Sequence, residues 1–299
     1  MRIKWFSLIR ITGLLLVLLY HFFQTIFPGG FFGVDVFFTF SGFLITSLLL
    51  EEFGKKSQID LLGFFKRRFY RIVPPVVLMV LVTMPFTFLV RQDYVAGIGG
   101  QIAGVLGFMT NFYEMLTGGS YESQFIPHLF VHNWSLAVEV HYYILWGLAV
   151  WFLSKRSKSS SQLRGTVFLL STGAFIISFF SMFIGSLMAS SYSSVYFSSL
   201  THVHPFFLGS ILATVVGVRQ TTDLVKQFDR MWDLRQNLLV FGAGLLVLLL
   251  LTFFVKFTYL FAYLFGFLLA SLAAVTMIFA ARVLHEKTPE IQEPRIITF

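Results

Sequence analysis

The 299-residue sequence contains no cysteine. This absence excludes disulfide bonds, thiolate nucleophiles and cysteine-ligated zinc. Charged residues are scarce as well, at 12%, whereas 57% of the residues are hydrophobic. A soluble domain of this length cannot bury so much apolar surface, so the composition indicates a polytopic membrane protein in contact with the lipid bilayer.

Acidic residues are the rarer charged type, with 14 Asp and Glu against 22 Lys and Arg and a net charge of +8. In a soluble protein this excess would suggest binding to nucleic acid. Here the basic residues cluster between apolar segments, which is the pattern of loops that set membrane topology. We therefore expect no nucleic-acid partner.

Long apolar stretches dominate the chain, and crossing a bilayer takes about 20 such residues. The N-terminus is basic and then apolar, like a signal peptide, but no small-residue cleavage site follows, so we expect an uncleaved first span. The sequence predicts an all-α protein with about eight transmembrane helices. They are expected at residues 8–27, 31–50, 72–90, 134–153, 166–189, 202–218, 238–255 and 257–281.

A ninth apolar stretch, residues 95–113, carries five glycines. If it does not cross the membrane, 20 of the 22 Lys and Arg residues fall on one side; if it crosses, they divide 10 against 12. The positive-inside rule favours the first arrangement. We therefore expect 95–113 to be a re-entrant segment buried by protein, in a multi-pass protein of the cell membrane with both ends of this chain cytoplasmic.

Two polar residues lie within the first predicted span. Arg10 and His21 are eleven residues apart, so on a helix they share one face, about 20° apart around it and about 16 Å apart along it. A charged group in lipid is costly and often functional. The structural alternative is that Arg10 extends to lipid phosphate while His21 belongs to a packing network.

Two carboxylates are expected near the depth of His21. Counted from the outer ends of their spans, His21 lies about 9 Å deep, Asp35 about 6 Å and Glu139 about 7 Å, with His141 close by. A carboxylate that orients His21 would leave the other ring nitrogen to act as a base or nucleophile on substrate. The alternative is a structural histidine–carboxylate pair that locks helices together. Asp35 is the expected partner, because 28–30 is a short turn, and Glu139 is its rival.

Polar groups also gather at the two ends of the predicted bundle. At the cytoplasmic end, Arg67, Arg68 and Arg71 share a helix face, and guanidinium groups suit both phosphates of a ligand and anionic lipid. At the outer end, the stretch 191–204 includes Tyr196 and His202 at the start of a span. For a tyrosine there, a place in the aromatic belt of the membrane is the alternative to a functional role.

Five of these motifs occur in an order that resembles the family-three membrane acyltransferases. The sequence is most similar to the membrane domain of Gram-positive peptidoglycan O-acetyltransferases. The motifs are an arginine and a histidine eleven residues apart in the first span, FFGVDVFFTFSGFLI, RRFYRIVPP, HNWSLAVEVHYYILW and THVHPFFLGSILA, over residues 10 to about 213.

The resemblance implies transfer of acetyl from cytoplasmic acetyl-CoA to extracytoplasmic sugar hydroxyls, here on muramic acid of the cell wall. It implies no metal. It identifies Arg10 and His21 as the essential pair of the first span, Asp35 and Glu139 as catalytic carboxylates, and Tyr196 as an outer relay. The resemblance also assigns donor binding to Arg10 and to the basic motif with Arg67, Arg68 and Arg71. It places His202 on the acceptor side.

The sequence departs from that pattern in two places. His141 stands where many members have glutamine, so its place on the acceptor side rests on position alone. The chain also stops at EPRIITF, where another apolar element begins. The resemblance implies at least one further span and an extracytoplasmic serine esterase-like domain, so residues 1–299 are expected to be an incomplete membrane domain that meets the cell-wall glycan through the missing part.

Two other classes of protein compete with this interpretation. A proton-coupled transporter or flippase for an anionic or lipid-linked substrate would use His21, Asp35 and Glu139 as a relay. Many transporters consist of two similar halves, and this sequence has no second copy of its polar motifs. A scaffold for cell-wall proteins would leave the intramembrane ionisable residues without a role.

Overall fold

The computed structural model describes residues 4–89, 95–117 and 128–288, and all regular elements within these ranges are helices. The long ones are α1 (Lys4–Phe22), α2 (Gly33–Lys56), α3 (Leu61–Thr83), α6 (Trp134–Arg156), α7 (Ser160–Met188), α11 (Leu234–Phe254) and α12 (Phe267–Lys287). The shorter ones are α4 (Ile98–Leu106), α5 (Thr110–Thr117), α8 (Tyr192–Phe197), α9 (His204–Val215) and α10 (Asp223–Met231). The all-α, multi-pass prediction is confirmed, with seven helices in these ranges long and apolar enough to span a membrane. The C-terminal stretch 293–299 lies outside the described residues.

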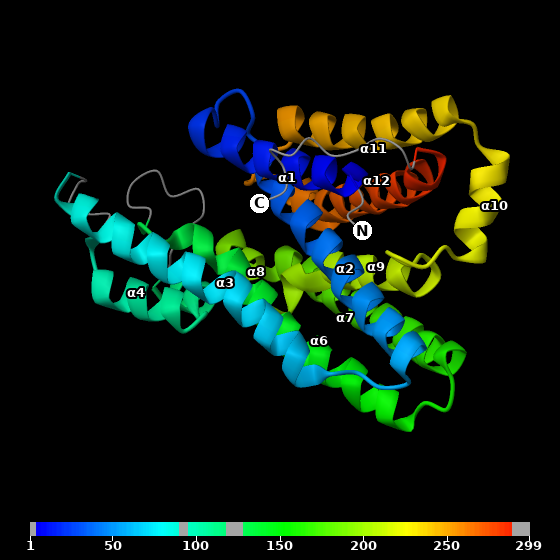
Figure 1. Cartoon of the computed structure of the whole chain (residues 1–299). Coiled ribbons are helices and arrows are strands. Elements are labelled where there is room, and N and C mark those ends of the chain that lie inside the picture. The colour runs from blue at the N-terminus through cyan, green and yellow to red at the C-terminus, as the bar shows by residue number, and fades with distance from the viewer. Residues whose placement is uncertain (1–3, 90–94, 118–127, 289–299) are drawn as a thin grey trace.

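Helix α2 runs through the middle of the molecule (Figure 1). On one side it contacts α1 and α12, and α11 packs against α12. On its other side it contacts α6, α7 and α9. Because α2 has protein on both sides, most of its length is buried, which explains why its sequence is apolar all round.

The sixth predicted span, residues 202–218, contains a helix of only 12 residues, α9, which covers about 18 Å. The whole segment nevertheless follows α2 in the same direction. Successive contacts along the two segments join Asp35 to His202, Thr46 to Ser210 and Glu51 to the backbone of Arg219. Residues 35–51 of α2 cover about 24 Å, so 202–219 passes through the same depth partly as non-helical chain, which is why seven long helices and eight crossings are compatible.

Two glycines allow α2 and α9 to approach closely. A Cβ atom on Gly42 would lie 1.8 Å from the carbonyl oxygen of Phe206, and one on Gly209 would lie 1.9 Å from that of Thr39. Small residues at helix contacts are typical of membrane proteins, where close backbone approach provides much of the packing energy. This contact fixes the position of α9, and hence of the chain on either side of it, against α2.

The glycine-rich stretch 95–113 forms α4, a turn and the start of α5 rather than one crossing helix. Helix α4 has nine residues, about 13.5 Å, and packs against both α5 and α3. Phe108 in the turn has a positive φ of 53°. The segment bends back on itself, as the prediction of a re-entrant segment requires.

Candidate functional site

A cavity of about 320 Å³ lies among α1, α2, α3 and α6, and we call it the core cavity. Its lining is mostly apolar but includes six polar side chains. These are Arg10, Ser41, Arg68, Arg71, Glu139 and Tyr143. The helices therefore bring Arg10 together with two arginines of the basic motif, residues that are about 60 positions apart in the sequence.

Glu139 is the acidic group of the core cavity. Ser41 Oγ and Tyr143 Oη both donate hydrogen bonds to its Oε1, so α2 and α6 hold the carboxylate in place. The guanidinium of Arg68 lies over the Tyr143 ring at 5.4 Å, and that of Arg10 lies over the Phe40 ring at 5.1 Å. Three guanidinium groups thus face one carboxylate in a small cavity, which leaves a positive site suited to an anionic ligand.

A second cavity, of about 510 Å³, is continuous in its lining with the first because Arg68 and Arg71 belong to both. We call it the mouth cavity. It lies at the end of the bundle where α2 finishes in Lys55 and Lys56. Arg67 lines only this cavity, and its side chain is 63% exposed with Glu52 4.0 Å away.

His21 lies at the other end of α1, with an exposed side chain. Its Nδ1–H donates to the carbonyl oxygen of Val17 at 2.7 Å. Because a carbonyl only accepts, Nδ1 carries a proton, and in the neutral ring the lone pair is then on Nε2. The His21 ring also lies 4.7 Å from the ring of His132. A backbone carbonyl, and not the predicted carboxylate, therefore sets a tautomer that is competent as a base or nucleophile.

Asp35 bonds to a different histidine. Its Oδ1 lies 3.2 Å from Nε2 of His202, and Nδ1–H of His202 donates to the carbonyl oxygen of Tyr196 at 2.8 Å. Neither side chain of the pair has exposed surface. Both ring nitrogens face acceptors, so the pair shares a proton: either His202 is protonated on both nitrogens or Asp35 is protonated. This geometry matches the structural alternative of a histidine–carboxylate pair that locks helices.

The expectation that His21, Asp35 and Glu139 lie at one depth is wrong. The ring of Trp134, the first residue of α6, stacks on His202 at 5.3 Å and so lies at the level of Asp35, well inside the protein. Glu139 is five residues further along α6, about 7 Å deeper. The prediction counted the depth of Glu139 from Trp134 as if Trp134 lay at the membrane surface. The resulting depth was too small, because α6 begins inside the bundle rather than at its end.

Comparison with known proteins bears on what these cavities do. A family model described as an acyltransferase domain, that of acyltransferase family three, matches residues 3–298. The chain belongs to this family. It is 32% identical over 207 residues to the O-acetyltransferase OatA of Staphylococcus aureus (strain NCTC 8325 / PS 47), an alignment that covers 69% of this chain and 34% of OatA. It is 34% identical over 206 residues to a putative O-acetyltransferase of Staphylococcus aureus (strain COL), covering 69% of this chain and 33% of that protein.

The chain thus aligns with about a third of the length of these curated relatives of the acyltransferase family. No solved structure matches it.

Of the remaining predicted site residues, Tyr196 is buried and His141 is half-buried, and both pack between segments. The side chain of Tyr196 has no exposed surface; its ring lies 4.5 Å from Trp134 and 4.7 Å from His202, so its hydroxyl is not at the outer mouth of the bundle. His141 joins α6 to two other segments. Its Nε2–H donates to the carbonyl oxygen of Phe108 at 2.8 Å, and its Nδ1 lies 3.1 Å from Ser199 Oγ.

Three residues that contact the candidate site residues were missed from the sequence. Tyr143 is four residues after Glu139, so helical spacing alone was enough to place it on the same face. His132 precedes the WSLAVE motif by two residues, and no local pattern connects it to His21. Ser41 carries no signal in the sequence, because its role depends on how α2 packs against α6.

Proposed function

We propose that this acyltransferase domain takes acetyl from acetyl-CoA at its basic, cytoplasmic end and passes it to a sugar hydroxyl on the other side of the membrane, in the glycan of the cell wall. The observation that carries the proposal is the pair of arginine-lined cavities that share Arg68 and Arg71. Acyltransferase family membership supports transfer chemistry, and the names of the two relatives support acetyl as the group and oxygen as the acceptor atom.

Each part of the donor has a matching surface in this proposal. Its phosphates bind at Arg67, Arg68 and Arg71, since guanidinium groups bind phosphate in forked pairs. The thioester arm enters the core cavity toward Arg10. The Phe37 ring lines that cavity and packs against α1 at Gly13, between Arg10 and His21, so we expect the arm to pass this ring on its way to His21.

The transfer step uses the lone pair on His21 Nε2. As a base, His21 removes the proton of the acceptor hydroxyl while the oxygen forms a bond to the acetyl carbon; the carbon–sulfur bond breaks and the thiolate of CoA leaves. As a nucleophile, His21 first forms an acetyl-imidazole and releases the thiolate; the acceptor hydroxyl oxygen then bonds to the acetyl carbon, the carbon–nitrogen bond breaks, and the freed Nε2 takes up the hydroxyl proton. His132, with its ring 4.7 Å away, is the neighbour that affects the charge His21 acquires.

The test is incubation of the purified chain in proteoliposomes with acetyl-CoA labelled in the acetyl group. We expect release of CoA in the wild type and its loss in Arg71→Ala. Arg156→Ala is the matched control, since Arg156 is also an exposed arginine at the basic end but lines neither cavity.

Proton-coupled uptake of a solute without CoA release would overturn the proposal in favour of a transporter. Transfer to muramic acid glycan is assayed with the full-length protein, because the relatives are about three times as long as the matched region.

A further inference from the structure

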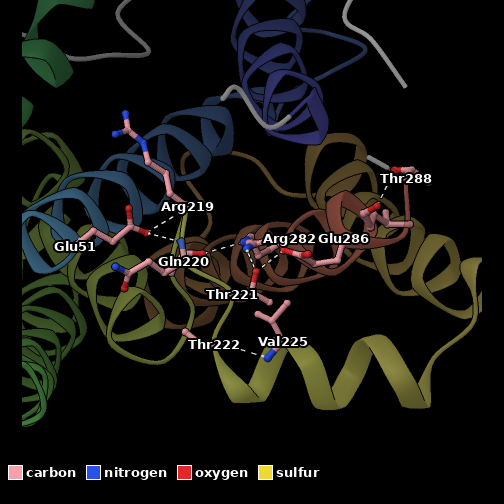
Figure 2. Close-up of polar contacts among 11 residues, drawn as sticks. Glu51, Arg219, Gln220, Thr221, Thr222, Val225, Arg282, Glu286 and Thr288 are labelled. Atoms are coloured by element: carbon pink, nitrogen blue, oxygen red, sulfur yellow. Dashed lines mark hydrogen bonds and ion pairs between the residues drawn. The ribbon is translucent and has the colours of Figure 1, made fainter. Parts of the chain in front are cut away.

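The loop between α9 and α10, residues 216–222, is held from two sides by buried charged side chains (Figure 2). From α2, Glu51 is only 3% exposed, and its Oε1 accepts the backbone N–H groups of Arg219 at 2.7 Å and of Gln220 at 3.3 Å. From α12, Arg282 is 1% exposed and its Nε donates to the carbonyl oxygen of Gly217 at 2.9 Å.

Two further bonds tighten this arrangement. Nη2 of Arg282 lies 3.2 Å from the Thr221 hydroxyl, and its Nη1 pairs with Glu286. A loop with so many charge-assisted hydrogen bonds has a defined backbone position. The side chain that this backbone carries toward the mouth cavity is Arg219.

Arg219 lines the mouth cavity together with the three arginines of the basic motif. Its side chain is exposed, and within the described ranges its guanidinium pairs with no carboxylate. The lining of the cavity holds six basic side chains against two acidic ones. Arg67, Arg68 and Arg71 come from α3, so Arg219 adds positive charge to the lining from a different segment, and a ligand with more than one phosphate can contact both segments.

Glu51 indicates that the ligand also has a hydrogen-bond donor. Its second oxygen, Oε2, is buried and has no hydrogen-bond partner among the residues that the structure describes, and Glu51 lines the same cavity as Arg219. In Figure 2 this oxygen and the Arg219 side chain extend to the same side of the loop. A buried carboxylate oxygen is favourable only beside a donor. A fully ionised phosphate group of a nucleotide has no donor to offer, whereas the hydroxyl groups of ribose and the amino group of adenine do.

We propose that the mouth cavity recognises a nucleoside phosphate, with Arg219 binding a phosphate group and Glu51 Oε2 accepting a hydrogen bond from a sugar hydroxyl or base amino group. This inference rests on the proposed function and adds to it the nucleotide end of the donor. It assigns Arg219 and Glu51, which lie outside the motifs of the sequence analysis, as binding residues, and it makes the loop 216–222 the second wall of the donor site.

The experiment measures binding without transfer. The purified chain in detergent is titrated by calorimetry with adenosine 3′,5′-bisphosphate and, separately, with inorganic pyrophosphate. Arg219→Ala is expected to weaken both by roughly 10- to 100-fold, as loss of a hydrogen bond to a charged group does. Glu51→Gln is expected to weaken the nucleotide alone, because its amide oxygen still accepts the two loop N–H groups while the amide NH₂ replaces the acceptor Oε2.

Arg156→Ala, at the same end of the bundle, is the control for net charge and is expected to bind both probes as the wild type does. Thermal unfolding in detergent confirms that each variant is folded. If both variants bind the nucleotide as tightly as the wild type while acetyl-CoA is still consumed, the inference fails and the proposed function stands. If the wild type itself does not bind the nucleotide, the donor site of the proposed function fails with it.

Discussion

Asp35 Oδ1 lies 3.2 Å from Nε2 of His202, and neither side chain has exposed surface. This pair joins α2 to the short helix Thr201–Val203 that precedes α9, at the end of the α2–α9 contact remote from Lys55 and Lys56. Leaving one partner of such a buried pair without its hydrogen bond costs about 1–3 kcal/mol, and more where that group is charged. We therefore expect Asp35→Asn to lower the thermal midpoint of the detergent-solubilised protein by many degrees. Normal stability together with lost transfer would instead place Asp35 in the chemistry.

His21 is expected to behave in the opposite way. Its side chain is exposed and its Nδ1–H donates to the backbone of its own helix, so His21→Ala should leave the thermal midpoint almost unchanged. Acetyl-CoA turnover should fall by at least the roughly 10²–10⁴-fold that a general base contributes. The assay compares His21→Ala with Asp35→Asn and Glu139→Gln at matched membrane levels. Turnover near wild type in His21→Ala would remove the catalytic role.

The three arginines of the basic motif are expected to differ. Arg68 and Arg71 line both cavities, whereas Arg67 lines only the mouth and is 63% exposed. Alanine at Arg68 or Arg71 should raise KM for acetyl-CoA by roughly 10- to 100-fold, and alanine at Arg67 by much less. Lysine at position 68 or 71 should restore little of the affinity for acetyl-CoA, since an ammonium group does not reproduce the forked hydrogen bonds of a guanidinium. If KM for acetyl-CoA in all three variants equals that of the wild type, the three arginines keep only a role in anchoring the protein to lipid.

Gly42 provides a test of the α2–α9 contact. An added methyl group would overlap the carbonyl oxygen of Phe206, so Gly42→Ala should sharply reduce the yield of folded protein in detergent. Gly173 on α7 is the matched control, because a Cβ there meets nothing within 4 Å. Gly173→Ala should be neutral or stabilise by about 0.5–1 kcal/mol, the ordinary preference for alanine in a helix. Similar yields from both variants would contradict the close contact.

The absence of cysteine makes the orientation of the chain directly measurable. Single cysteines at Ser57 and Ser159 lie at exposed positions of the basic end, and one at Ser194 lies at an exposed position of the opposite end. In intact cells an impermeant thiol reagent should label Ser194→Cys and spare the other two. Labelling of Ser159→Cys from outside would reverse the topology after α3, and with it the expectation that 95–113 does not cross.

Local pattern in the sequence determined the helical architecture. Hydropathy and the distribution of Lys and Arg require only short windows of chain, and they predicted the multi-pass class and the folding back of 95–113. Helical spacing was equally local: it placed Arg10 and His21 on one face, and it placed Arg68 and Arg71 together on α3, where both now line the two cavities.

Only the tertiary structure decided which polar groups meet. Depth in a bilayer cannot be counted from a motif when a helix begins inside the bundle, as α6 does at Trp134, so Glu139 lies with Arg10 and Ser41 rather than with His21. Asp35 pairs with His202, 167 residues away, because Gly42 and Gly209 bring α2 and α9 into backbone contact. The period of a helix tells which way a side chain points along its own axis, but the partner it meets depends on the axial offset between helices, and that offset is set by packing between segments far apart in the chain.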